Sequence, residues 1–194
     1  MQKKQIYDNA LFATMMSGAA KLFLKMWGWK LAPGCTNLKK VVVIAAPHTS
    51  NWDFLFFLAV TSINRLPLNF MAKHTLFKGF FGRIFYYLGG VPVHRSKEGA
   101  ADMVDQMVLA FAERDIMQLC ITPEGTRSKV KKWKTGFYRI ALAAGVPIVL
   151  GFVDAKTKTT GFGPVFHPTG DMDADIAEIK KFYAEKVGVN ANND

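Results

Sequence analysis

Cysteine is scarce in this chain of 194 residues, which contains only Cys35 and Cys120. The two lie far apart and have neither metal-ligand nor redox-motif spacing, so we expect free thiols in a reducing compartment. No set of histidines, cysteines and acids has ligand spacing, and we predict no metal site. The sequence also lacks a Gly-x-Ser-x-Gly motif, which removes the nucleophile elbow of serine hydrolases from consideration. Internal repeats and low-complexity stretches are missing, and the length fits one domain with a substantial core.

A long uncharged apolar run is missing as well. The apolar segment near the N-terminus is interrupted by Lys21 and Lys25, well short of the ~20 residues that a membrane-spanning helix needs. Lys3 and Lys4, followed by the small and apolar residues of 10–20, are also compatible with a secretory signal peptide. However, the helical pattern continues past the position where such a peptide would be cleaved. A narrow polar stripe recurs every three or four residues and consists of Thr14, Ser17, Lys21, Lys25 and Gly28.

The remaining surface of this N-terminal helix is apolar and includes Trp27 and Trp29. A wide apolar face with flanking lysines and interfacial tryptophans is typical of a helix that lies in a membrane surface. The alternative is a helix that packs on the core of its own domain. We therefore divide the chain into an N-terminal amphipathic region, residues 1–34, and a main domain, residues 35–194.

Positive charge is in excess, with a net charge of +10 and a pI of about 9.6. Half of the residues are hydrophobic and 13% are aromatic, which excludes a disordered chain. The excess of positive charge indicates an anionic partner: a phosphate-bearing substrate, an acidic carrier, nucleic acid or an anionic membrane. The basic residues show no readable interleaving with aromatics and no nucleic-acid motif is present, so we expect no nucleic-acid partner.

Apolar runs with strand and helix character alternate along the chain. Strands are expected at 41–46, 68–72, 91–95, 116–122 and 146–150, and helices at 52–63, 76–88, 99–113, 135–144 and 173–187. Residues 154–170 are expected to form loops or an edge hairpin. The helix at 52–63 is apolar all round and is expected to be central. The aromatics of 76–88 suit either core packing or a lipid-facing or acyl-lining role. This alternation predicts an α/β fold with a largely parallel or mixed sheet flanked by helices.

In such folds the sites gather beyond the carboxyl ends of the strands, where His48 and Asp53 are expected. Residues five apart on a regular helix point about 140° apart. The two side chains therefore meet only if His48 lies in the turn and Asp53 in the first helical turn, with Ser50 or Asn51 as the N-cap. A carboxylate that accepts from one imidazole nitrogen leaves the other free as a base, which predicts a catalytic dyad. The alternative is an aspartate that only stabilises the helix dipole.

A second group follows the strand at 116–122. Gly125 permits close backbone approach, Thr126 offers a hydroxyl and Arg127 offers a planar fork for phosphate oxygens. Glu124 is expected to orient Arg127 or to accept from a substrate hydroxyl. The residues predict a phosphate site, and the alternative is a plain surface turn. A basic loop, residues 129–134, comes next.

Together these groups resemble the motifs of the glycerolipid acyltransferases typified by 1-acylglycerol-3-phosphate acyltransferase. The H-x4-D block is 48–53, and a looser Gly-x-x-x-x-x-Arg block is 89–95. The Glu-Gly-Thr-Arg block is unaltered at 124–127, and a Val-Pro-Ile-Val strand is 146–149. The resemblance runs from about 41 to 150, in the order of the family.

The resemblance implies transfer of a fatty acyl group from acyl-CoA or acyl carrier protein to a lysophospholipid hydroxyl, with 1-acylglycerol-3-phosphate as the leading acceptor. His48 would be the base and Asp53 its partner, while Arg95 and Lys73 would join Glu124–Arg127 in substrate binding. The thioester is a co-substrate, so no cofactor is expected. Backbone N–H groups near Asn51 are candidate oxyanion donors. We expect a peripheral, monotopic protein on the cytoplasmic face of a membrane.

Two residues depart from the family pattern, His94 before Arg95 and His74 after Lys73. Because the second block recognises the acyl acceptor in the family, they leave other acceptors open, such as glycerol-3-phosphate or a lyso-aminolipid. The other alternative is a basic module without enzymatic activity that binds membrane or nucleic acid.

Overall fold

The structure is a computed structural model that describes residues 5, 8–34, 37–94, 100–125, 130 and 132–190. Its helices are α1 (Ala10–Met26), α2 (Asn51–Asn64), the 3-10 helix η2 (His74–Phe77), α3 (Gly79–Tyr87), α4 (Ala100–Ala112), α5 (Gly136–Ala144) and α6 (Met172–Tyr183). Its strands are β1 (Lys30–Leu31), β2 (Lys40–Ala46), β3 (Leu68–Lys73), β4 (Gly90–Val93), β5 (Met117–Ile121), β6 (Ile148–Asp154) and β7 (Thr159–Phe166).

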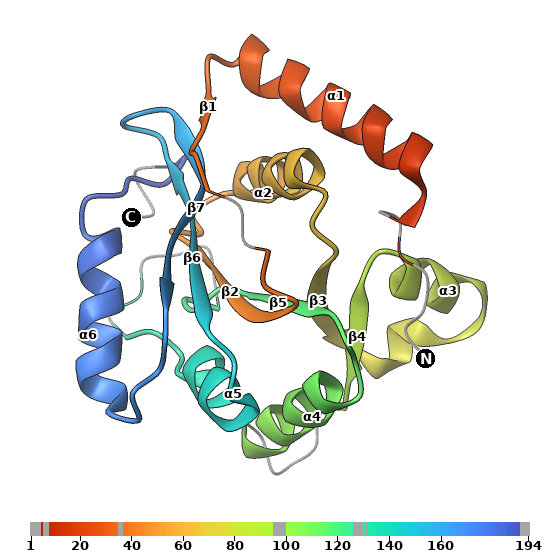
Figure 1. Ribbon diagram of the computed structural model, residues 1–194, viewed down its shortest axis with the longest axis vertical. Helices are drawn as coiled ribbons and strands as arrows, with labels where there is room; N and C mark the ends of the chain where they lie inside the picture. Colours follow the sequence, from red (N-terminus) through yellow and green to blue (C-terminus); the bar gives the residue numbers. More distant parts are fainter. Residues whose placement is uncertain are drawn as a thin grey trace.

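The strands form one mixed sheet in the order β1-β7-β6-β2-β5-β3-β4 (Figure 1). Neighbouring strands are parallel except for β6 and β7, which form an antiparallel hairpin. Helices α1 and α2 cover one face of the sheet, and α4 and α5 cover the other (Figure 1). The mixed α/β sheet flanked by helices, expected from the alternating pattern, is confirmed.

Strand β2 lies at the centre because its side chains are apolar on both faces. Val41, Val42 and Ile44 are fully buried, as a strand covered by helices on both sides requires. Val42 and Ile44 belong to the core under α4 and α5, while Val41 joins the core on the side of α2. Strand β2 therefore delivers the turn that follows it, residues 47–50, to the middle of the carboxyl edge of the sheet.

The outer strands differ from the expectation for residues 154–170. Strand β7 pairs with β6 as a hairpin, but it is not an edge strand, because β1 continues the sheet beyond it. Lys30 and Leu31 pair in parallel with Thr159 and Thr160. The N-terminal region is thereby tied to the sheet just after α1.

Two helices also differ from the pattern. The expected helix at 76–88 is broken into η2 and α3, because Gly79 adopts a left-handed φ of +60°. The last helix ends at Tyr183, four residues early. Beyond it Val187 donates to Asp154 Oδ1 at 3.3 Å and accepts from Ala155 at 2.7 Å, which holds this segment against the end of β6.

Helix α2 is less central than its all-apolar sequence predicts. Its inner side buries Phe56 and Ala59 in a cluster with Leu24 of α1. Trp52 and Phe54, in its first turn, stay partly exposed, with exposed fractions of 44% and 59%. None of the helices in the described part of the chain is long and apolar enough to cross a membrane.

Candidate active site

His48 and Asp53 meet across the turn between β2 and α2. Ser50 is the N-cap of α2, so Asp53 occupies the first helical turn and closes a capping box with Ser50. Its Oδ2 accepts from the backbone N–H groups of Thr49 at 2.6 Å and Ser50 at 2.7 Å. The same oxygen lies 3.4 Å from His48 Nδ1. The spacing of five residues therefore brings the two side chains together through the geometry that the sequence requires, and their catalytic role stays a prediction.

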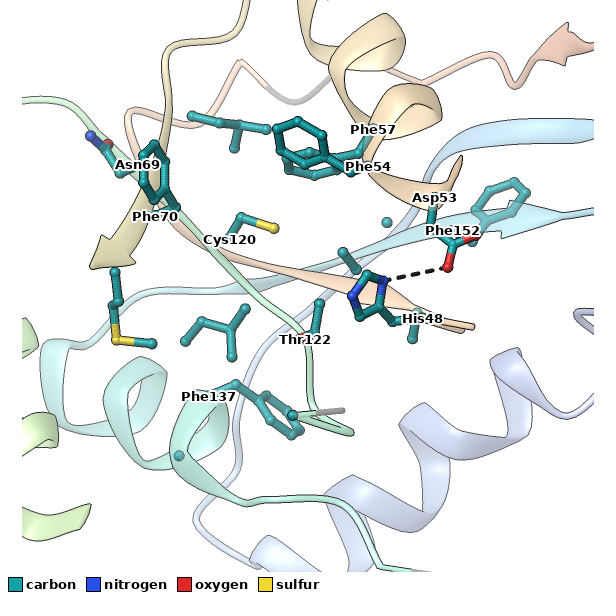
Figure 2. Close-up of a pocket in the computed structure, with 18 of the residues that line it drawn as sticks. His48, Asp53, Phe54, Phe57, Asn69, Phe70, Cys120, Thr122, Phe137 and Phe152 are labelled. Atoms are coloured by element: carbon teal, nitrogen blue, oxygen red, sulfur yellow. Dashed lines mark ion pairs between the residues drawn. The ribbon is translucent and has the colours of Figure 1, made fainter. Parts of the chain in front are cut away.

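The Asp53 carboxylate is rigidly held and largely removed from solvent. It is 5% exposed and sits at the N-terminal end of a helix dipole, which stabilises negative charge. Because Nδ1 of His48 faces the carboxylate, Nε2 is directed away from it (Figure 2). The imidazole keeps 21% of its side-chain surface accessible, so an incoming hydroxyl can reach it. The backbone N–H groups of Thr49 and Ser50 already donate to Asp53. Of the N–H groups at the start of α2, that of Asn51 is therefore the candidate oxyanion donor.

An apolar cavity of about 520 Å³ adjoins the imidazole. Phe54 and Phe57 of α2, Phe70 of β3, Cys120 of β5 and Phe137 of α5 point into it (Figure 2). The volume is within the range of about 300–1,000 Å³ that is typical of ligand sites. A wall of hydrocarbon and aromatic groups is suited to an acyl chain, with His48 and Asp53 at one end of the cavity and Asn69 at the other (Figure 2).

The cavity exists because two strands separate. Strand β3 pairs with β5 over three residues only, Leu68–Phe70, whereas β2 stays paired with β5 up to Ile121. Beyond Phe70 the chain of β3 follows β4 instead. Residues 71–72 and 121–122 line the opening that results.

Glu124 lies against the turn that carries His48. Burial raises the pKa of the Glu124 carboxyl, although the backbone N–H groups of Glu124 and His48 and the His48 imidazole favour its charged form. Its Oε2 is buried and has no hydrogen-bond partner among the described residues. Sequence reasoning assigned Glu124 to Arg127 or to a substrate hydroxyl and missed this contact with the backbone of His48.

Gly125 adopts a left-handed φ of +64°, a conformation that favours glycine at this position. A Cβ at this position would lie 2.6 Å from Lys134 Nζ, so the ammonium is packed against the turn. Lys134 also lines the cavity, which the sequence indicated only as part of a basic loop. Thr126 and Arg127 lie outside the described residues.

The ends of β3 and β4 bring the second block next to the cavity. Lys73 is exposed at the end of β3, and Arg95 lies outside the described residues. The rings of His74 and His94 are stacked, with centroids 4.0 Å apart. The Gln106 side chain accepts from the backbone N–H of His94 at 2.8 Å and donates to its carbonyl at 2.9 Å. Sequence reasoning missed Gln106 because nothing in the pattern of its helix distinguishes it.

Cys120 is a free cysteine in the cavity wall. Burial raises the pKa of its thiol to about 12, so the group stays neutral at physiological pH. A neutral thiol is a poor nucleophile, and Cys120 therefore contributes shape and apolar surface to the cavity.

The fold and the site together define an α/β protein in which a histidine–aspartate pair adjoins an apolar cavity. The family model described as Acyltransferase matches residues 31–149, and the chain belongs to this acyltransferase family. The match spans the His48–Asp53 pair, the separated strands and the sequence of residues 124–127, so these features lie within the family domain.

Two curated relatives and one solved structure are similar to this chain. The 1-acyl-sn-glycerol-3-phosphate acyltransferase of Salmonella typhimurium is 27% identical over 143 residues, which cover 72% of this chain and 57% of the relative. The Escherichia coli protein of the same name is 30% identical over 112 residues, 55% of this chain and 44% of the relative. The chain thus spans about half the length of these relatives.

The crystal structure of the 1-acyl-sn-glycerophosphate (LPA) acyltransferase PlsC from Thermotoga maritima superimposes with a TM-score of 0.55. It is 16% identical, and the match covers 88% of this chain and 76% of the other. At this identity the likeness shows that the fold is shared.

Proposed function

We propose that the protein transfers a fatty acyl group from a thioester, acyl-CoA or acyl carrier protein, to the hydroxyl of a lysophospholipid. The leading acceptor is 1-acylglycerol-3-phosphate, and the product is then phosphatidic acid. The observation that carries the proposal is the His48–Asp53 pair, 3.4 Å apart, beside an apolar cavity of about 520 Å³. Membership of the acyltransferase family and the names of the two relatives support it.

The chemical step follows from the orientation of the imidazole. The acceptor hydroxyl gives its proton to Nε2 of His48, and its oxygen forms the new ester bond with the acyl carbon. The carbon–sulfur bond breaks, and the departing thiolate takes up the proton. Asp53 holds the tautomer of His48 and stabilises the imidazolium that forms between these events. No enzyme nucleophile is required, because a thiolate is a good leaving group.

The acceptor is positioned by its phosphate. We assign this role to Arg127, Thr126 and Arg95, with Lys73 and Lys134 as further positive charges at the edge of the site. Guanidinium groups bind phosphate oxygens in a fixed geometry, which places the acceptor hydroxyl near His48. Positioning of this kind can lower the activation barrier of the reaction by up to about 7–11 kcal/mol.

We further propose that the N-terminal helix α1 holds the enzyme at a lipid surface. Leu11, Met15, Leu22 and Met26 of α1 are exposed by 59–74%, beside Lys21 and Lys25. This arrangement is typical of a helix in the membrane interface. We assign the protein to the cytoplasmic face as a peripheral, monotopic enzyme, where acyl thioesters are made.

A thiol-release assay with purified protein, acyl-CoA and lysophosphatidate tests the proposal. His48→Ala should abolish release that depends on the acceptor, while His167→Ala, an exposed histidine in the loop before α6, should retain it. Wild-type activity in His48→Ala would contradict the dyad. No thiol release by the wild type with any acceptor would favour a binding module instead.

The stacked pair of His74 and His94 favours a second candidate acceptor. The pair lies directly beyond Ala72 and Val93 of the cavity wall, at the block that recognises the acceptor in the family. The same reaction on glycerol-3-phosphate or on a lyso-aminolipid is therefore the alternative. Incubation with one acyl donor and each acceptor in turn, followed by lipid mass spectrometry, separates the three.

A further inference from the structure

The net positive charge of the chain comes from one half of the sequence. Residues 1–97 contain 13 basic and 2 acidic residues, a net charge of +11, whereas residues 98–194 contain 12 basic and 13 acidic residues, a net charge of −1. The two acids of the first half are Asp8 and Asp53, and Asp53 is buried beside His48. The surface of α1, α2, η2 and α3 is therefore almost free of negative charge.

Most of the exposed large apolar side chains lie in the same half. Among the described residues, 17 large hydrophobic side chains are exposed, and 14 of them lie between residues 11 and 88. A soluble surface would mix these groups with charges of both signs. The combination of apolar and purely basic groups is instead complementary to a bilayer that contains anionic lipids.

Helix α3 is the part of this surface that the N-terminal helix does not explain. Phe80 and Phe81 are exposed by 74% and 71%, and Ile84 by 39%. Lys78 and Arg83 flank them and are exposed as well. On the inner side Gly82 packs against the backbone of Phe77, where a Cβ would come within 2.2 Å of the carbonyl oxygen. The helix is thus fixed on the domain through its glycine side, while two adjacent phenylalanines project outward.

We infer that α3 is a second membrane-binding element, which inserts Phe80 and Phe81 into an anionic lipid surface while Lys78 and Arg83 bind lipid headgroups. Helices α1, α2 and α3 lie along the upper and right-hand side of the molecule in Figure 1, away from α5 and α6. The inference rests on the proposed action at a lipid surface and adds a contact far in sequence from α1.

The cavity opens on the same surface. Phe54 is 59% exposed and also belongs to the cavity wall, so the cavity reaches the surface beside α2. Trp52, two residues before Phe54, packs on Trp27 of α1 with ring centroids 5.3 Å apart. Contacts with the bilayer through α1 and α3 therefore place the mouth of the cavity at the lipid, and an acyl chain enters it without crossing water.

Vesicle cosedimentation without any substrate tests the inference. The wild-type protein should bind vesicles of phosphatidylcholine with phosphatidylglycerol more tightly than vesicles of phosphatidylcholine alone. The double variant Phe80→Ser/Phe81→Ser should bind the mixed vesicles about tenfold more weakly, because it lacks the two aromatic rings that move from water into the lipid on binding. The matched control is Leu109→Ser/Leu142→Ser, which removes two exposed leucines of α4 and α5 and should bind like the wild type.

The contribution of Lys78 and Arg83 is measured separately, as the preference for anionic over neutral vesicles. Lys78→Glu/Arg83→Glu should remove about tenfold or more of the preference for anionic vesicles, since each basic group near the surface contributes about fivefold. Thermal melting verifies that each variant is folded, and all four side chains are exposed, so folding should be retained.

Two results would overturn the inference. One is that the serine variant of α3 binds the mixed vesicles as tightly as the wild type. The other is that it loses a dimer detected by sedimentation while vesicle binding is unchanged, which would make α3 an interface between copies of the chain. Because no substrate is present, these results are independent of acyl transfer: an inactive protein that binds through α3 refutes the proposed reaction and leaves this inference intact.

Discussion

Replacement of Asp53 by asparagine removes the negative charge beside His48 and keeps the size and shape of the side chain. The amide oxygen can still accept from Thr49 and Ser50, which Oδ2 of Asp53 contacts at 2.6 and 2.7 Å. The amide NH2 then takes the place of Oδ1, which is buried and has no partner among the described residues. An unsatisfied donor there costs about 1–3 kcal/mol of stability, so a lower Tm is expected.

The loss of rate follows from the loss of charge. An imidazolium and a carboxylate 3.4 Å apart attract each other by about 5 kcal/mol at an effective dielectric of about 20. The His48 side chain is 21% exposed, so water screens part of this attraction. A loss of about 2–4 kcal/mol remains, which corresponds to a kcat about 30- to 1,000-fold lower.

The assay is acceptor-dependent thiol release at saturating acyl-CoA, with kcat and KM determined separately. KM for the acceptor should change little, because Asp53 acts through His48 and is not among the residues assigned to the phosphate of the acceptor. Asp173→Asn is the matched control: it makes the same chemical change in the first turn of α6, on an exposed side chain. A folded Asp53→Asn protein with kcat within about threefold of the wild type would refute this reasoning.

Two further predictions concern the acceptor and the cavity wall. Arg127→Ala should raise the acceptor KM or lower kcat/KM at an unchanged KM for acyl-CoA, and unchanged acceptor kinetics would remove Arg127 from the site. Burial raises the pKa of the Cys120 thiol from 9.0 to about 12. The neutral buried thiol therefore makes its full contribution to the free energy of unfolding below pH 9, and this contribution is lost as the pH rises toward 12. Between pH 8 and pH 10, urea unfolding should show that the free energy of unfolding of the wild type falls by about 1 kcal/mol more than that of Cys120→Ala. The kcat of Cys120→Ala should stay at the wild-type value. An equal fall in both proteins would contradict the burial of the thiol.

The sequence predicted the frame of the fold because its central strands are buried on both faces. Residues 41–46 form a short apolar run that is rich in β-branched residues and is followed by Pro47, which indicates a covered strand rather than a buried helix. The turn after it was predictable too, since the spacing of His48 and Asp53 permits contact only in one arrangement around an N-cap. Strand β1 was not predictable, because two residues carry no periodic signal and pair with β7 only in three dimensions.

The site was predictable only where its residues stand close together in sequence. The contact of Glu124 with the His48 turn and the hydrogen bonds of Gln106 to His94 join segments far apart in the chain. The cavity depends on the separation of β3 from β5 after Phe70, which is a property of strand pairing rather than of any motif. The outer sides of α2 and α3 were ambiguous because apolar side chains have the same pattern whether a core or a lipid surface covers them.

The most direct measurement follows both products in the same reaction. Wild-type protein, one equivalent of acyl-CoA and excess lysophosphatidate are mixed, and free thiol and phosphatidate are quantified over time in parallel with the His48→Ala variant. We predict that thiol and phosphatidate appear together in a one-to-one ratio with the wild type, that neither appears with His48→Ala, and that omission of the acceptor suppresses thiol release. Equal rates for the two proteins, or thiol release at full rate without an acceptor, would contradict direct attack by a hydroxyl that His48 deprotonates.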